Sequence, residues 1–259
     1  MGVQSTPDII AACAKSAEAA GMESAWIVDH IAIPPDDAEG SGGRYLDPLV
    51  TLAWLAAATG TIKLGTAVLI LPYRPALPTA KQIASIQELS GERLIVGAGI
   101  GWMDPEFKAL GIDRHQRGRI SDATLQVIND CFANDTVTLN GQTFLFKPRP
   151  AKPPIYIGGA APHALRRAAR YGDGWLPMGA DPAKLPAQMQ LYKEFCDEAG
   201  RPMGKVTVMG GLPADADAAQ ARFDAFQEVG VERFVCGMRY DDHAEYTAQL
   251  ERLVKIRRA

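Results

Sequence analysis

The chain has 259 residues and a formal net charge of −3 at pH 7, with 27 Lys and Arg against 30 Asp and Glu. It offers no basic field for nucleic acid and no apolar stretch long enough to span a bilayer, so we expect neither partner. The four cysteines, Cys13, Cys131, Cys196 and Cys236, lack paired or metal-like spacing. This spacing is typical of reduced thiols in a soluble, cytoplasmic protein without a metal site.

The first predicted elements are a helix over 8–21 and a strand over 24–30. Apolar side chains fill this strand, yet it ends in a carboxylate and an imidazole, Asp29 and His30. In a protein of repeating βα units, polar groups at the carboxyl ends of strands lie where ligands bind. His30 is therefore the first catalytic candidate.

Short β-branched runs alternate with longer amphipathic runs through the rest of the chain. Strands are predicted over 62–70, 94–101, 155–160, 174–178, 206–212 and 233–238, and helices near 79–90, 120–132, 162–171, 183–199, 218–229 and 242–257. This alternation predicts an α/β fold with a parallel sheet, and so many units favour a (β/α)8 TIM barrel. Only seven such strands can be counted, so the barrel lacks its first strand. It borrows one from a partner, stays open at a seam, or has lost a segment.

Two stretches interrupt the repeat within a single predicted domain, 1–259. Pro34 to Asp47 is a loop rich in Gly, Pro and Asp, and it is either a lid over the rim that holds His30 or plain surface disorder. Residues 136–147 predict a β-hairpin that turns at Asn140-Gly141.

Two glycine clusters follow predicted strands. Gly97 to Gly101 has the spacing of part of a dinucleotide fingerprint, but several βα units precede it and Trp102-Met103 follows, so we reject that interpretation. Gly158, Gly159 and Ala160 precede Pro162 and a helix, an arrangement that favours a phosphate cradle. A tight turn without a ligand is the alternative.

Four blocks together resemble the luciferase-like flavin- and deazaflavin-dependent oxidoreductases. They are GMESAWIVDH at 21–30, IKLGTAV at 62–68, LIVGAGIGW at 94–102, and PIYIGG at 154–159 followed by ARYGDGW at 169–175. The Asp29-His30 pair is most similar to the branch that uses coenzyme F420, a deazaflavin. The resemblance covers nearly the whole chain in the family's order, which makes it more specific than any single motif.

The resemblance implies a luciferase-like barrel, usually a homodimer, that holds the cofactor ring at its carboxyl rim. His30 is expected beside the ring as an acid/base or charge-stabilising group, with Asp29 either orienting or tuning the imidazole or bonded to backbone as a rim carboxylate. The block Gly65, Thr66, Ala67 and Val68 is expected to carry a non-proline cis peptide beneath the ring, at Ala67-Val68. The resemblance places Gly99 and Gly101 near the ring and phosphate, and Gly158 with Gly159 at the cofactor's phosphodiester.

One position departs from the family pattern. Some sugar-phosphate dehydrogenases of this branch place a catalytic glutamate directly after the glycine block, where this chain has Trp102, so that activity is in doubt. Glu106 lies nearby, but Asp104-Pro105-Glu106 is typical of a helix start, and we interpret Glu106 as an acid favoured by the helix dipole.

The expected function is hydride transfer between F420 and a small organic substrate. Two alternatives stay open: an FMN-dependent luciferase-like monooxygenase, and a catalytically silent cofactor-binding protein. The choice of substrate depends on the rim loops.

Overall fold

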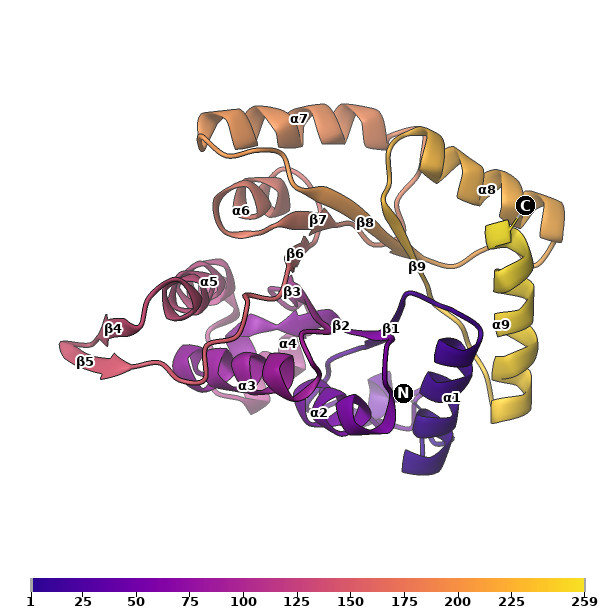
Figure 1. Ribbon diagram of the computed structural model, residues 1–259, viewed down its shortest axis with the longest axis horizontal. Helices are drawn as coiled ribbons and strands as arrows, with labels where there is room; N and C mark the ends of the chain where they lie inside the picture. The colour runs from indigo at the N-terminus through magenta and orange to yellow at the C-terminus, as the bar shows by residue number, and fades with distance from the viewer. Residues whose placement is uncertain (1, 259) are drawn as a thin grey trace. The chain divides into compact units, whose positions relative to one another are not determined.

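The structure, a computed structural model, describes residues 2–258 and divides them into two compact units. The first unit holds residues 2–3 and 27–154, and the second holds residues 4–26 and 155–258. β1 (Ser24–Ile27) lies at the boundary between these sequence ranges. Figure 1 labels the helices and strands of both units.

The first unit carries the loop after β1 and the middle of the chain. Its elements are η1 (Pro35–Asp37), α2 (Pro48–Ala58), β2 (Lys63–Ile70), η2 (Leu71–Tyr73), α3 (Ala76–Leu89), β3 (Leu94–Gly99), α4 (Asp104–Ala109), η3 (Arg114–Gln116), α5 (Arg117–Ala133), β4 (Thr136–Leu139) and β5 (Gln142–Leu145). β2 and β3 pair in parallel, and α3 packs against both α2 and α5. The continuous apolar runs of β2 and β3 are buried on both faces of the sheet, as parallel strands covered by helices require.

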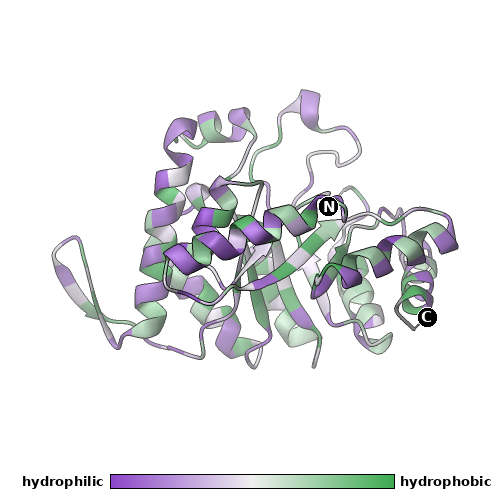
Figure 2. Cartoon of the chain, turned by 90° about the horizontal axis from the view of Figure 1, so that it is seen from above, coloured by the Kyte–Doolittle hydropathy of each residue, from purple (hydrophilic) through white to green (hydrophobic). Residues whose placement is uncertain are grey.

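The second unit repeats the strand and helix alternation. Its elements are α1 (Pro7–Ala19), β6 (Ile155–Gly158), α6 (His163–Tyr171), β7 (Gly174–Leu176), α7 (Leu185–Glu198), β8 (Lys205–Gly210), α8 (Ala216–Glu228), β9 (Arg233–Cys236) and α9 (His243–Arg258). The strands β6, β7, β8 and β9 pair in parallel in chain order. α6 packs on α7, and α9 packs on α1 and α8. Figure 2 shows hydrophobic residues concentrated on strands and alternating with hydrophilic ones along helices.

The predicted hairpin is confirmed. β4 and β5 are antiparallel, and Asn140 and Gly141 connect them with φ values of 52° and 77°. Two positive φ values are what a type I′ turn needs, which is why Asn-Gly is found there. Figures 1 and 2 both show the hairpin extending away from the rest of its unit.

All seven predicted strands of the βα repeat are present, as β1 to β3 and β6 to β9. Residues 2–6, which precede α1, contain no strand. Within residues 2–258, no helix combines the length and the apolar character needed to cross a membrane.

Two details differ from the sequence-based expectation. β1 ends at Ile27, so Asp29 and His30 lie in the segment after the strand rather than at its last positions. The helix α2 was not predicted, because its sequence PLVTLAWLAAA is apolar almost throughout and shows no helical period. Asp47 begins this helix by accepting hydrogen bonds from the amides of Leu49 and Val50.

Candidate functional site

His30 is held by a buried carboxylate in the first unit. Its Nδ1 lies 2.9 Å from Oε2 of Glu106, and its side chain is 16% exposed. The edges of two aromatic rings flank the imidazole, with centroid distances of 4.8 Å to Tyr45 and 6.3 Å to Trp102. The imidazole is therefore fixed in place while part of it stays open to a ligand.

Glu106 is fully buried, with a side chain that is 0% exposed. Its Oε1 accepts hydrogen bonds from the amides of Ile31 and Ala32 at 2.7 and 3.0 Å, and its Oε2 also accepts one from the Tyr73 hydroxyl at 2.9 Å. With the His30 contact, four hydrogen bonds surround a carboxylate that offers about four lone-pair sites. Burial alone would raise the pKa of Glu106, but the bonds from Ala32, Ile31, His30 and Tyr73 lower it overall.

The short helix α4 positions this carboxylate. α4 has six residues, and Phe107 anchors it by packing on Ile70 and Tyr73 in a buried cluster. The rings of Tyr73 and Phe107 meet edge to face, with centroids 5.1 Å apart. The apolar packing thus fixes Glu106 where it reaches His30.

The interpretation of Glu106 as merely a helix-start acid is wrong. Its hydrogen bonds go to His30, Tyr73 and the loop after β1, and none of the four goes to its own helix. One sequence signal could have raised suspicion: Glu106 lies in the segment directly after a glycine-ended strand, where parallel α/β folds bind ligands.

The hydrogen bonds of Asp29 go to the backbone and to Arg74. Its Oδ2 accepts from the backbone amide of Ile70 at 2.8 Å, and both its oxygens accept from Arg74. Arg74 also reaches Asp47 at 2.7 Å. Desolvation would lower the pKa of the Arg74 guanidinium, but the two aspartates raise it overall. The rim-carboxylate interpretation, bonded to backbone, is the one that the structure bears out.

The expected non-proline cis peptide is present at Ala67-Val68. The register between β2 and β3 shifts between Thr66 and Leu69, so this segment bulges out of the regular ladder. Gly65, Thr66 and Ala67 are buried, and the Thr66 hydroxyl donates to the carbonyl of Gly97 at 2.8 Å. Val68 is half-buried, so it is the one residue of the four whose side chain is partly exposed.

The glycines at the end of β3 have packing reasons of their own. A Cβ at Gly99 would collide with the Val68 side chain. Gly101 has a φ of +75°, and a Cβ there would lie 2.8 Å from Cγ2 of Ile70. Both glycines adjoin the bulge and the α4 cluster, so the structure groups them with His30 in the first unit.

The predicted phosphate cradle lies in the second unit. β6 ends at Gly158, which is buried, while Gly159 and Ala160 are exposed and lead through a cis Ala161-Pro162 bond into α6. The Gly159 carbonyl accepts from the Trp175 indole at 2.9 Å, which orients the turn. A side-chain-poor turn before the amino end of a nine-residue helix fits an anion.

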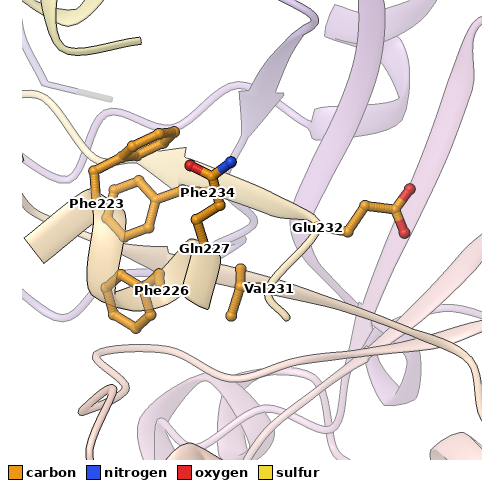
Figure 3. A pocket seen from close by; sticks show the side chains of 6 residues that line it. All are labelled: Phe223, Phe226, Gln227, Val231, Glu232 and Phe234. Carbon is orange, nitrogen blue, oxygen red and sulfur yellow. The ribbon is translucent and has the colours of Figure 1, made fainter. Parts of the chain in front are cut away.

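A cavity of about 300 Å³ also lies in the second unit. It is lined by Phe223, Phe226, Gln227, Val231, Glu232 and Phe234. In Figure 3 the three phenylalanine rings gather on one side, whereas the Glu232 carboxylate points away from them. Glu232 is paired with Lys205, so the side chains that line this cavity offer no unpaired acid or base for catalysis.

No group of three or more potential metal-ligating side chains is found among residues 2–258.

Known proteins resemble the chain along most of its length. It is 33% identical over 206 residues to an uncharacterised protein of Mycobacterium tuberculosis, covering 73% of this chain and 71% of that one. It is 31% identical to a 5,10-methylenetetrahydromethanopterin reductase of Methanolobus tindarius, covering 82% of this chain and 64% of the reductase. It is also 31% identical to an F420-dependent glucose-6-phosphate dehydrogenase of Kineococcus radiotolerans, covering 84% and 67%.

Solved structures share its fold at low sequence identity. The monooxygenase RslO1 of Streptomyces bottropensis superposes with a TM-score of 0.82 at 18% identity, covering 96% of this chain and 91% of that one. An F420-dependent secondary alcohol dehydrogenase gives 0.76 at 18% identity, covering 94% and 92%. The FMN-bound oxygenating constituent of 3,6-diketocamphane monooxygenase of Pseudomonas putida gives 0.78 at 15% identity, covering 96% and 91%. These matches confirm the TIM-barrel-like, luciferase-like α/β fold.

The family model for luciferase-like monooxygenases matches residues 1–258. This match takes in all four blocks on which the sequence resemblance depends. The chain therefore belongs to the luciferase-like monooxygenase family.

Proposed function

We propose that this luciferase-like oxidoreductase uses F420 and transfers a hydride between the deazaflavin and a small organic substrate. The observation that carries the proposal is the fixed imidazole of His30, bonded through Nδ1 to the buried Glu106 beside the bulge of β2. Two relatives at 31% identity support it, one named as F420-dependent and one as a methylenetetrahydromethanopterin reductase.

The residues of this chain fit a flat, phosphorylated cofactor. In the first unit, the bulged segment Thr66 to Val68 offers a firm surface, because buried neighbours and the Thr66 hydrogen bond hold it. In the second unit, the exposed Gly159 and Ala160 leave an open turn before α6. We assign the ring to the first segment and the phosphodiester to the second.

The bound cofactor would supply the hydride acceptor or donor, and the chain's own residues would do the rest. His30 holds or moves the proton that accompanies the hydride, a task suited to imidazole near neutral pH. Trp102, which is 66% exposed, and Tyr45 lie on the imidazole edges and limit how a substrate approaches. Arg74 and Asp29 fix the segment that leads into His30.

Titration of the purified protein with oxidised F420 and with FMN, read by absorbance and fluorescence, tests this proposal. We expect saturable binding of F420, followed by bleaching of its absorbance when a panel of small alcohols is offered as hydride donors and recovery when carbonyl compounds are added to reduced F420. Binding of F420 without any turnover across the panel would instead identify a silent binding protein, and binding of neither cofactor would end the proposal.

A second candidate is an FMN-dependent monooxygenase. The two monooxygenase structures with TM-scores of 0.82 and 0.78, one of them bound to FMN, favour it. A separately supplied flavin reductase distinguishes the candidates. Tight FMN binding, with oxygen uptake that depends on reduced FMN, would replace the F420 proposal with this one.

A further inference from the structure

The two oxygens of the Glu106 carboxylate have separate tasks. Oε1 accepts from the amides of Ile31 and Ala32 and so fixes the start of the loop after β1. Oε2 accepts from Tyr73 and lies 2.9 Å from Nδ1 of His30. One oxygen therefore holds the backbone around the imidazole, and the other holds the imidazole itself.

An ionised carboxylate can only accept hydrogen bonds. Four contacts around Glu106 keep its pKa below the ordinary value despite burial, so the group is a carboxylate at neutral pH. The hydrogen between Glu106 and His30 must then reside on Nδ1. In neutral imidazole only one ring nitrogen carries a hydrogen, so Nε2 is left with its lone pair.

We propose that Glu106 is a positioning residue that holds His30 in the Nδ1–H tautomer, which makes Nε2 the atom that takes or gives the substrate proton. The proposal rests on the proposed hydride-transfer function and adds the group that prepares the imidazole for it. Among the residues that the structure describes, none is shown bonded to Nε2, and the His30 side chain is 16% exposed.

The proposed reaction balances protons and electrons in both directions. When a substrate alcohol is oxidised, a bound deazaflavin would supply the acceptor for the C–H hydride, and the O–H proton would go to Nε2. The imidazole becomes an imidazolium, whose charge is compensated by the adjacent carboxylate at 2.9 Å. In the reducing direction, the imidazolium returns the proton from Nε2 to the oxygen of the new alcohol.

Glu106→Gln separates this role from a merely structural one. The glutamine carbonyl must face the amides of Ile31 and Ala32, because its NH₂ group cannot sit against two donors. Its NH₂ group then occupies the place of Oε2 and donates to Nδ1, which must become an acceptor. The loop contacts survive, yet the tautomer is reversed to Nε2–H.

¹⁵N NMR of histidine-labelled protein reads the tautomer without any assay of activity. The chain has four histidines, and comparison with His30→Gln assigns the signals of His30. At a pH where the imidazole is neutral, we expect Nδ1–H in the native protein and Nε2–H in Glu106→Gln. An Nε2–H signal in the native protein would overturn the proposal even if the variant fails to fold.

Turnover completes the test with the substrate that the F420 screen identifies. We expect Glu106→Gln to lower kcat about 10²- to 10⁴-fold with KM changed only a few-fold, since the effect is on proton transfer. Tyr73→Phe is the matched control, because it removes another donor to the same oxygen and leaves the tautomer unchanged. A reversed tautomer with unaltered kcat would overturn the role of Nε2. Absence of turnover in the native protein would instead count against the proposed function, while the NMR result would still decide the tautomer.

Discussion

Asp29 and Arg74 form a two-point ion pair, with Oδ2 to Nη1 at 2.6 Å and Oδ1 to Nη2 at 2.9 Å. Asp29 is 0% exposed and Arg74 is 11% exposed. Because Asp29 directly precedes His30, the pair holds the backbone from which the imidazole projects. Asp47, at the far end of the loop, binds the same guanidinium, so Arg74 fixes both the entry and the exit of the segment between residues 29 and 47.

Asp29→Asn should therefore destabilise the protein by leaving the Arg74 charge incompletely paired. We expect the free energy of unfolding in urea to fall by about 2–4 kcal/mol, somewhat under the usual cost of breaking a buried pair, because Asp47 remains. Asp47→Asn is the control. Asp47 is 41% exposed, and Asn is as good a helix cap as Asp. The free energy of unfolding of Asp47→Asn should therefore fall by no more than about 1 kcal/mol. Equal decreases in the free energy of unfolding of the two variants would show that Asp29 is not the main partner of Arg74.

His30→Ala should affect the reaction far more than the binding of cofactor. The imidazole is the proton-handling group in the proposed function, whereas the cofactor is assigned to the backbone of residues 66–68 and 159–160. We expect the rate of hydride transfer to fall about 10²- to 10⁴-fold in stopped-flow absorbance, with the Kd for F420 changed only a few-fold. Unchanged turnover would remove His30 from the mechanism.

Gly99→Ala should disturb the bulge of β2, because the added methyl group meets the Val68 side chain. The expected cost is about 1–3 kcal/mol in thermal or urea unfolding, typical of overpacking. Gly210→Ala is a matched control at the last residue of another strand, β8, where the nearest atom to an added Cβ is 3.8 Å away. Adding Val68→Ala to the Gly99→Ala variant should restore part of the lost stability. If it does not, the added methyl group does not clash with Val68.

Sequence patterns predicted the parts of this molecule that depend on local signals. The Asn140-Gly141 turn, the strand and helix alternation and the cis peptide at Ala67-Val68 were all placed correctly, the last through the family resemblance. The role of Glu106 could not be read in this way, because its partner His30 is 76 residues earlier and only packing of α4 brings them together. α2 was missed for a related reason: tertiary contacts bury one face of it, but its exposed face carries the apolar Val50 and Trp54, so the sequence shows no amphipathic period.

Acid should weaken the fold partly through Glu106. Its folded-state pKa is lowered by the hydrogen bonds that outweigh burial, so its ionised form contributes stability above the unfolded pKa of about 4.3. That contribution is lost as the pH falls through the lowered folded-state value. We expect native protein and Glu106→Gln to differ most in unfolding free energy near neutral pH and to converge as the pH falls below that lowered value. A difference that stays constant from neutral to acid pH would show that ionisation of Glu106 does not stabilise the fold.

The turn after β6 can be tested with two substitutions of similar size at one exposed position. Ala160→Glu places a carboxylate where the cofactor phosphodiester is assigned, and Ala160→Gln adds nearly the same volume without charge. Neither should unfold the protein, since Ala160 is exposed and stands outside the helix.

If an anion lies at this turn, the Kd for F420 should rise about 10-fold or more in the glutamate variant, which corresponds to about 1.4 kcal/mol, and much less in the glutamine variant. The difference in Kd between the two variants should shrink at high ionic strength, because salt screens repulsion between exposed charges. Equal affinities in the two variants at low salt would move the phosphate away from this turn and leave its glycines with a purely conformational role.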